Sequence, residues 1–109
     1  MKVAIATDGD LVSLHFGRCE GYTFFEIEDG KIVSRVFEEN PGHQPGLIPK
    51  WLKEKGVNLV IAGGAGPRAQ EFFKSLGIDF ILGVQGKVED VIQKYLKGEL
   101  EGGESTCER

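Results

Sequence analysis

The chain has 109 residues, of which 40% are hydrophobic and 28% charged, and its formal net charge is -4. This length suits one small domain, and this composition is typical of a globular protein, which excludes a disordered chain. The acidic balance argues against nucleic acid as the main partner, because phosphate binding needs a basic surface. No apolar run approaches the ~18–20 residues of a membrane span, so no membrane association is expected.

The N-terminus and the cysteines indicate the compartment. The apolar run that follows Met1 and Lys2 is too short for a signal peptide. The two cysteines, Cys19 and Cys107, lie far apart in the sequence. Without a secretory signal a disulfide framework is not expected, so we predict a reducing, cytoplasmic location.

The first forty residues predict three strands. Residues 3–6 form a short apolar run that is typical of a buried central strand. Residues 11–21 show no sustained period and are expected to form a loop. Two runs rich in aromatic and β-branched residues, 22–28 and 31–37, are joined by Asp-Gly. This pattern is the strongest short-range signal for a β-hairpin.

The rest of the chain predicts alternating helices and strands. Apolar residues recur at helical spacing in three stretches, each of which ends at a glycine, and two short apolar strands lie between them. The expected elements are a helix over 47–55, a strand over 57–62, a helix over 67–76, a strand over 78–82 and a helix over 88–97. Together these elements predict one α/β domain over residues 1–98, with a polar, mobile tail over residues 99–109.

Strand direction brings three distant segments together. Right-handed crossovers make the strands after the helices parallel to the first strand, and a hairpin makes residues 31–37 parallel to it as well. Ligands in open α/β sheets bind beyond the carboxyl ends of the strands. The segments that leave this edge are residues 8–19, 39–43 and 63–68, and they hold most of the unusual chemistry in the sequence.

The first of these segments contains His15-Phe16-Gly17-Arg18-Cys19. An imidazole and a thiolate are good ligands for iron and other transition metals, so His15 and Cys19 are candidate metal ligands. The alternative is a packed histidine beside a buried free cysteine, which is a common place for cysteine. His43 and Cys107 could supply further ligands, or they could be a solvated loop histidine and an exposed thiol.

The third segment, Gly63-Gly64-Ala65-Gly66-Pro67-Arg68-Ala69, leaves a predicted strand and opens a predicted helix. Glycines allow close approach to the backbone, and a helix N-terminus attracts negative charge. A dinucleotide site is not favoured, because this loop comes late in the chain and no acidic residue ends the next strand. The alternative is a tight turn in which glycine is needed for steric reasons alone. Asp8 has no acidic partner at the end of the neighbouring strand, so a two-metal nuclease site is not supported.

Three motifs together resemble the dinitrogenase iron-molybdenum cofactor biosynthesis family. They are His15-Phe16-Gly17-Arg18, Glu39-Asn40-Pro41-Gly42 and the segment from Gly63 to Ala69, and the resemblance extends from Lys2 to about Leu100. It implies a ribonuclease H-like α/β fold with a mixed sheet of about five strands, a β-hairpin and three helices. It also implies a cytoplasmic nitrogenase accessory protein that is not an enzyme.

The resemblance further implies a cargo and its contacts. The cargo would be iron-molybdenum cofactor or a related iron-sulfur cluster, received from a donor protein and passed to an acceptor protein. His15 is the proposed key ligand, with Cys19 as a second one, while Arg18, Arg68 and the helix start at Pro67 would balance the negative charge of a cluster. The candidate cofactor-binding residues are His15, Phe16, Gly17, Arg18, Asn40, Gly64, Gly66, Pro67 and Arg68.

Two other functions remain open from the sequence. A small phosphate- or nucleotide-binding enzyme would use residues 63–68 as its anion site. A regulatory or interaction module would use the same loops to dock a partner protein. The sequence does not give the oligomeric state.

Overall fold

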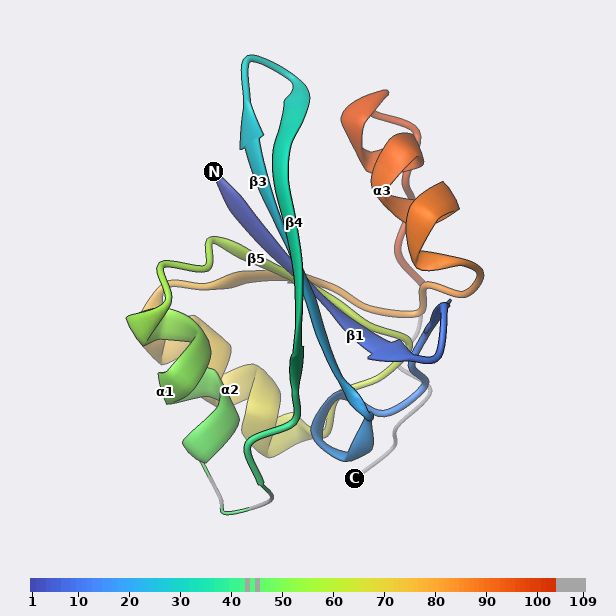
Figure 1. Ribbon diagram of the computed structural model, residues 1–109. Helices are drawn as coiled ribbons and strands as arrows, with labels where there is room; N and C mark the ends of the chain where they lie inside the picture. Colours follow the sequence, from blue (N-terminus) through green and yellow to red (C-terminus); the bar gives the residue numbers. More distant parts are fainter. Residues whose placement is uncertain (43, 45, 104–109) are drawn as a thin grey trace.

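A mixed β-sheet forms the centre of the molecule, with helices on both of its faces (Figure 1). The computed structural model of the protein describes residues 1–42, 44 and 46–103. The elements in chain order are β1 (Lys2–Asp8), β2 (Leu11–Val12), a 3-10 turn η1 (Phe16–Arg18), β3 (Gly21–Glu28), β4 (Lys31–Glu39), α1 (Leu47–Glu54), β5 (Leu59–Ile61), α2 (Pro67–Leu76), β6 (Asp79–Ile81) and α3 (Val88–Leu96).

The strand directions agree with those predicted. The order across the sheet is β4-β3-β1-β5-β6, with β2 paired to β1. β3 is antiparallel to both β1 and β4, and β5 is parallel to both β1 and β6. The carboxyl ends of β1, β4 and β5 therefore lie at the same edge of the sheet. The α/β class, the mixed sheet and the three helices are confirmed for the described residues, and the ribonuclease H-like assignment stays a prediction.

The segment predicted as a loop contains ordered structure. Leu11 and Val12 form β2, which pairs with the end of β1 and gives the sheet six strands instead of about five. Residues 16–18 form η1. A two-residue strand and a single 3-10 turn are too short for hydrophobic periodicity to reveal. β5 and β6 are shorter than the apolar runs that predicted them. Val57 and Ile78, at the start of these runs, are buried, but their N–H groups donate to the preceding helices and not to a strand.

The predicted hairpin is confirmed, and its turn explains why Asp-Gly stands there. Asp29 has a φ of 53° and Gly30 a φ of 75°. A type I′ turn requires positive φ at both central residues, and Asp followed by Gly tolerates this best. Near the start of β4 its register with β3 shifts by one residue, between Glu26 and Ile27 of β3. β4 therefore pairs with β3 without interruption only from Ser34 onward.

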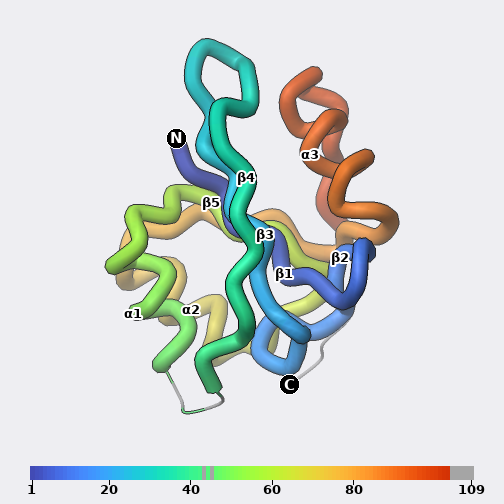
Figure 2. The backbone as a smooth tube through the Cα atoms, viewed as in Figure 1, coloured from blue at the N-terminus to red at the C-terminus, as the bar shows by residue number. Residues whose placement is uncertain are grey.

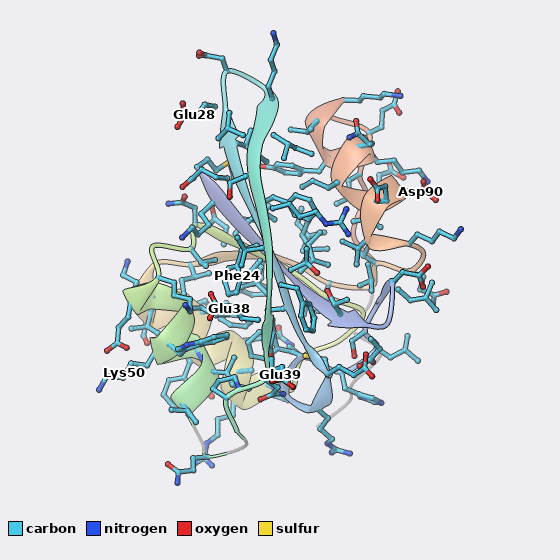
Figure 3. The ribbon with its side chains drawn as sticks, in the orientation of Figure 1. Phe24, Glu28, Glu38, Glu39, Lys50 and Asp90 are labelled. Carbon is cyan, nitrogen blue, oxygen red and sulfur yellow. The ribbon has the colours of Figure 1, made fainter. Side chains whose placement is uncertain are left out.

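The two faces of the sheet carry different helices (Figures 1 and 2). β1 directs Ala4 and Ala6 toward the face covered by α1 and α2, and Val3 and Ile5 toward the face covered by α3. The small alanines leave room for an aromatic cluster on the α1 and α2 face. In Figure 3 Phe24 lies between the sheet and α1, where its ring centroid is 5.6 Å from that of Trp51.

The described chain ends beside β6. The backbone N–H of Gly103 donates to the carbonyl of Leu82 at 2.7 Å, so the first part of the predicted tail is held against the sheet. Cys107 and His43 lie outside the described residues. Within the described ranges, no helix is long and apolar enough to cross a membrane.

Candidate functional site

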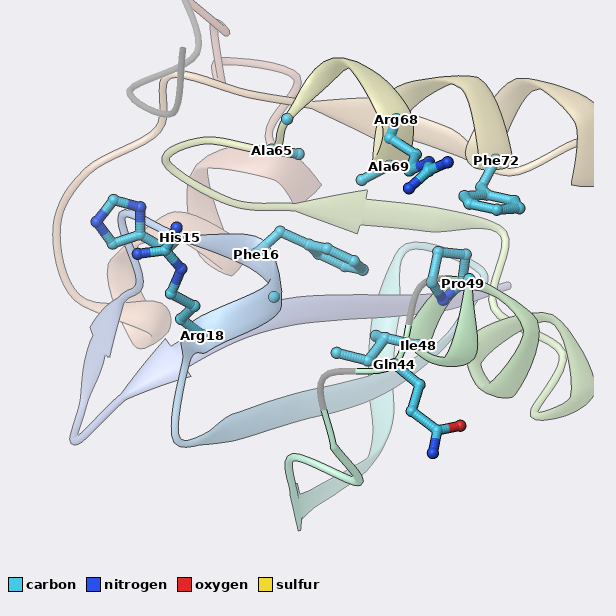
Figure 4. A pocket seen from close by; sticks show the side chains of 13 residues that line it. His15, Phe16, Arg18, Gln44, Ile48, Pro49, Ala65, Arg68, Ala69 and Phe72 are labelled. Carbon is cyan, nitrogen blue, oxygen red and sulfur yellow. The ribbon is translucent and has the colours of Figure 1, made fainter. Parts of the chain in front are cut away.

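A pocket of about 340 Å³ lies at the carboxyl edge of the sheet, on the face that carries α1 and α2 (Figure 4). Its walls come from the segment around η1, from the chain that follows β4, and from the loop and helix that follow β5. Two of these walls come from segments that the sequence predicts to converge, 8–19 and 63–68. The other wall comes from Gln44 and residues 46–49, which directly follow the predicted segment 39–43. The pocket is lined by His15, Phe16, Gly17, Arg18, Gln44, Gly46, Ile48, Pro49, Ala65, Gly66, Arg68, Ala69 and Phe72.

The η1 segment supplies the polar mouth of the pocket. His15 and Arg18 are exposed, and both side chains lie toward the same end of the pocket in Figure 4. Phe16 between them is only 3% exposed, and its ring points inward as the floor. The Phe16 N–H donates to the carbonyl of Gly64 at 2.8 Å, and the Tyr22 hydroxyl donates to the carbonyl of Phe16. Burial of Phe16 and these two hydrogen bonds therefore fix the backbone from which the exposed side chains of His15 and Arg18 project.

Asn40 joins two walls of the pocket but does not line it. Its side-chain amide donates to the carbonyls of Gly17 at 3.1 Å and Cys19 at 2.9 Å. Its amide oxygen accepts from the N–H of Gly42 at 2.9 Å. The residue predicted to contact the cofactor thus has a positioning role, because it connects the η1 segment to the chain that follows β4.

The third wall is the loop between β5 and α2. The N–H of Gly63 donates to the carbonyl of Ser13 at 2.8 Å, and Gln70 Nε2 donates to the carbonyl of Ala65 at 2.8 Å. Gly66 and Arg68 line the pocket, whereas Gly64 and Pro67 do not. Pro67 occupies the first turn of α2, as predicted. The free N–H groups of a first helical turn and the Arg68 guanidinium make this wall attractive to an anion.

Positive charge gathers at the pocket without a partner. In residues 1–42, 44 and 46–103, neither Arg18 nor Arg68 pairs with a carboxylate, and no hydrogen bond holds the His15 imidazole. Figure 4 shows Arg18 at one end of the pocket and Arg68 toward the other, so an anion in the pocket would be attracted by both guanidinium groups. The arrangement therefore favours an anionic ligand, for which His15 can supply a neutral nitrogen.

The inner wall of the pocket is apolar and was missed from the sequence. Ile48 and Pro49 come from α1, and Ala69 and Phe72 from α2. The sequence pattern assigns such residues to the core, because a helical stripe does not distinguish a buried face from a pocket wall. Gly46 does offer a signal, since its φ is 78° and a Cβ there would lie 3.0 Å from the Phe72 ring.

Cys19 is buried instead of lining the pocket. It is 4% exposed and belongs to the core on the α1 and α2 face, and its Sγ donates to the carbonyl of Phe16 at 3.3 Å. Burial raises the pKa of the Cys19 thiol, which disfavours the thiolate that a metal requires. The structure therefore favours the alternative interpretation of this residue. Nowhere in the described part of the chain do three or more His, Cys, Asp or Glu side chains gather in a group that could hold a metal.

Comparison with known proteins places the chain in a family. A family model described as dinitrogenase iron-molybdenum cofactor matches residues 1–98. The chain belongs to this family. The match covers all the helices and strands and the three motifs that line or support the pocket, so the predicted resemblance is confirmed.

Relatives of the chain share its length as well as its fold. An uncharacterized protein of Methanocaldococcus jannaschii is 37% identical over 106 residues, which cover 93% of this chain and 90% of that protein. The crystal structure of PH0822 is 36% identical, covers 98% of this chain and 100% of its own, and superposes with a TM-score of 0.90. The apo form of the orange protein from Desulfovibrio gigas is 21% identical, covers 95% and 93%, and has a TM-score of 0.78, which shows the fold alone.

Proposed function

We propose that this protein binds a preassembled, anionic metal-sulfur cluster of the iron-molybdenum or iron-sulfur type at the pocket and passes it on. His15 is the ligand to the metal, and Arg18 and Arg68 neutralise the charge of the cluster. The observation that carries the proposal is the convergence of these three side chains on one cavity, in a chain that belongs to the dinitrogenase iron-molybdenum cofactor family.

The donor set favours a carrier over a protein with a resident cluster. Resident iron-sulfur clusters are held by several cysteine thiolates, usually four. Here the described residues offer one exposed imidazole, and Cys19 is buried. One metal-ligand bond supported by charge-assisted hydrogen bonds can hold a cluster that keeps its own remaining ligands. Such a site also releases its cargo readily, as transfer from a donor protein to an acceptor protein requires.

The pocket's shape supports the same cargo. Its volume of about 340 Å³ lies within the range of small-molecule and cofactor sites. The sulfide surface of a cluster is poorly hydrated and suits the apolar wall formed by Ile48 and Phe72. His15 would take the place of one terminal thiolate of the cluster, which leaves as free thiol, while the metal–sulfide bonds of the cluster stay intact. The proposed role is therefore binding and transfer, not catalysis, within the cytoplasm.

The test is anaerobic loading with a synthetic [4Fe–4S] cluster that carries small thiolate ligands. Wild-type protein should retain iron and sulfide after gel filtration and show charge-transfer absorption in the visible range. His15→Ala should lose most of this absorption. Leu14→Ala is the matched control, because Leu14 is exposed and adjacent to His15 but does not line the pocket. Wild-type protein that stays colourless and free of iron would contradict the proposal.

A small oxyanion such as phosphate is the second candidate, favoured by Arg18, Arg68 and the start of α2. Titration of the same protein preparation with inorganic phosphate distinguishes this candidate from the cluster. Phosphate binding that is unchanged by His15→Ala and lost in Arg68→Gln would support this candidate.

A further inference from the structure

β4 presents a long free edge to solvent. It lies at the end of the sheet order, and no strand in the described part of the chain pairs with its outer side. Figures 1 and 2 show it crossing in front of the other strands, between α1 and α3. An open edge of this kind carries unpaired N–H and C=O groups and is a template for another strand.

Three exposed apolar side chains lie along β4 among its charged residues. Val33 is 55% exposed, Val36 is 48% exposed and Phe37 is 49% exposed. Edge strands are normally protected by charged residues or by bulges along their length. Here the irregularity lies opposite Ile27, so the part of β4 from Ser34 to Glu39 is regular and holds two of these apolar residues.

The hydrogen bonds to β3 determine which backbone groups of β4 point outward. The Asn40 N–H donates to the carbonyl of Glu20 at 2.9 Å. Because bonding alternates along an antiparallel pair, residues at even positions in the regular part bond to β3. The N–H and C=O groups of Arg35, Phe37 and Glu39 therefore point away from the sheet and are positioned to receive a further strand.

Arg35 and Glu39 carry opposite charges and stand two residues on either side of Phe37. Antiparallel pairing of two copies about that residue places Phe37 opposite Phe37 and Arg35 opposite Glu39, once on each side. Residues directly opposite in such a ladder share a face of the sheet and interact. Arg35 is now paired with Glu89 at 3.0 Å on the surface, and both side chains are exposed. The Arg35 guanidinium also lies over the Phe25 ring, 5.4 Å from its centroid. The exposed ion pair with Glu89 contributes little, so Arg35 can exchange this carboxylate for another.

We propose that a second copy of this chain pairs with β4 in antiparallel orientation about a two-fold axis at Phe37. The two sheets then become one continuous sheet, and the exposed apolar side chains of both edges cover each other. Pairing about Arg35 instead would place two like charges opposite each other and would extend the ladder across the irregular start of β4. The proposal does not depend on the function of the pocket.

A charge-reversal cycle tests the pairing in the full chain by sedimentation over a dilution series. Wild type should show a monomer–dimer equilibrium. Arg35→Glu and Glu39→Arg should each weaken it by about tenfold or more, because each replaces two attractive pairs by two repulsive ones. The double variant should recover the wild-type constant. Lys31→Glu is the control with the same charge change on the same strand, and it should leave the dimer unchanged.

Crosslinking gives a second readout that does not rest on charge. The axis places residue 37 opposite its own copy at a Cα separation of ~5.5 Å, which a disulfide can span. Phe37→Cys in a Cys107→Ser background should form dimers on mild oxidation, whereas Val33→Cys should not. Wild type that is monomeric throughout the dilution series would overturn the proposal. A dimer that Lys31→Glu dissociates and that the double variant does not restore would also overturn it.

Discussion

Arg68 combines two sources of positive potential at one position. Its guanidinium lines the pocket, and its backbone belongs to the first turn of α2, where the helix dipole is positive. The interaction with an anion at this exposed site is screened by salt, because the Debye length is ~8 Å at physiological ionic strength. Arg68 therefore controls the salt dependence of binding as well as its strength.

Arg68→Gln is expected to weaken binding of the synthetic cluster about tenfold and to flatten the dependence of Kd on salt concentration. The measurement is a set of binding titrations at increasing sodium chloride. Lys74→Gln removes an exposed positive charge from the last turn of the same helix and should change neither quantity. Equal effects of the two substitutions would mean that net charge, not the pocket, attracts the cluster.

Cys19 and Tyr22 make the fold sensitive to alkaline pH. Burial raises the pKa of the Cys19 thiol above its ordinary value of 9.0, and burial also raises the pKa of the Tyr22 phenol above 10.0. Above these values the unfolded chain releases protons that the folded protein retains. The free energy of unfolding is therefore constant below the ordinary values and falls as the pH rises through them.

Denaturant unfolding at a series of pH values between neutrality and pH 11 checks this expectation about the two buried groups. Tyr22→Phe should reduce the alkaline loss of stability, and Cys19→Ala should reduce the part that begins at lower pH. Neither side chain lines the pocket, but both donate to the Phe16 carbonyl, so cluster binding by each variant should be measured near neutral pH beside its stability. A steep alkaline loss that persists in the double variant would exclude these two groups as its cause.

Between elements, the contacts of Asn40 hold the η1 segment to the end of β4. Asn40→Ala removes both side-chain donors and leaves two carbonyls less well satisfied, so we expect a loss of ~1–3 kcal/mol in the free energy of unfolding. Cluster affinity should fall as well, because His15 and Arg18 lose their fixed position. Hydrogen exchange should accelerate over residues 15–19.

Asn58→Ala is the control for this experiment. Asn58 Oδ1 accepts from the backbone N–H of Lys2 at 2.8 Å, at the edge of the sheet far from the pocket. This variant should lose stability without losing affinity for the cluster. An Asn40→Ala variant that binds the cluster as wild type does would show that the η1 segment holds its position without the amide.

Sequence patterns predicted the elements well where their signals are local. Asp29-Gly30 specifies its turn because both residues tolerate a positive φ. Pro67 marks the start of α2 because it has no N–H to leave unpaired, and Gly77 marks the end because it tolerates a positive φ. The convergence of three loops followed from strand direction alone. By contrast, β2 pairs with the adjacent end of β1 in a tight local hairpin, and its two residues are too few to show an alternating pattern.

Within the site, exposure was the property that sequence could not supply. His15 and Cys19 are both metal-ligating residue types in one loop, yet one faces the pocket and the other lies in the core. The difference arises from how the 3-10 turn directs successive side chains. The role of Phe72 was missed for a similar reason, because a residue in a helical apolar stripe can belong either to the core or to a pocket wall.

For the whole molecule, ligand binding should be measurable as stability. The pocket walls come from three segments that are far apart in the chain, and an unfolded chain does not keep them together. A cluster present at 100 times its Kd should therefore raise the free energy of unfolding by ~2.7 kcal/mol. Thermal unfolding with and without the synthetic cluster checks this, and His15→Ala should show little of the shift. Equal shifts in both proteins would indicate binding elsewhere.

α3 packs on the opposite face of the sheet from the pocket, and Lys94 on this helix is exposed. That separation leaves one side of the protein available for attachment chemistry. A fluorophore or an affinity handle at Lys94 can follow loading and unloading of the protein in real time without obstructing the cargo's entrance. The same arrangement allows the chain to be immobilised by α3 while candidate donors and acceptors are passed over its open side.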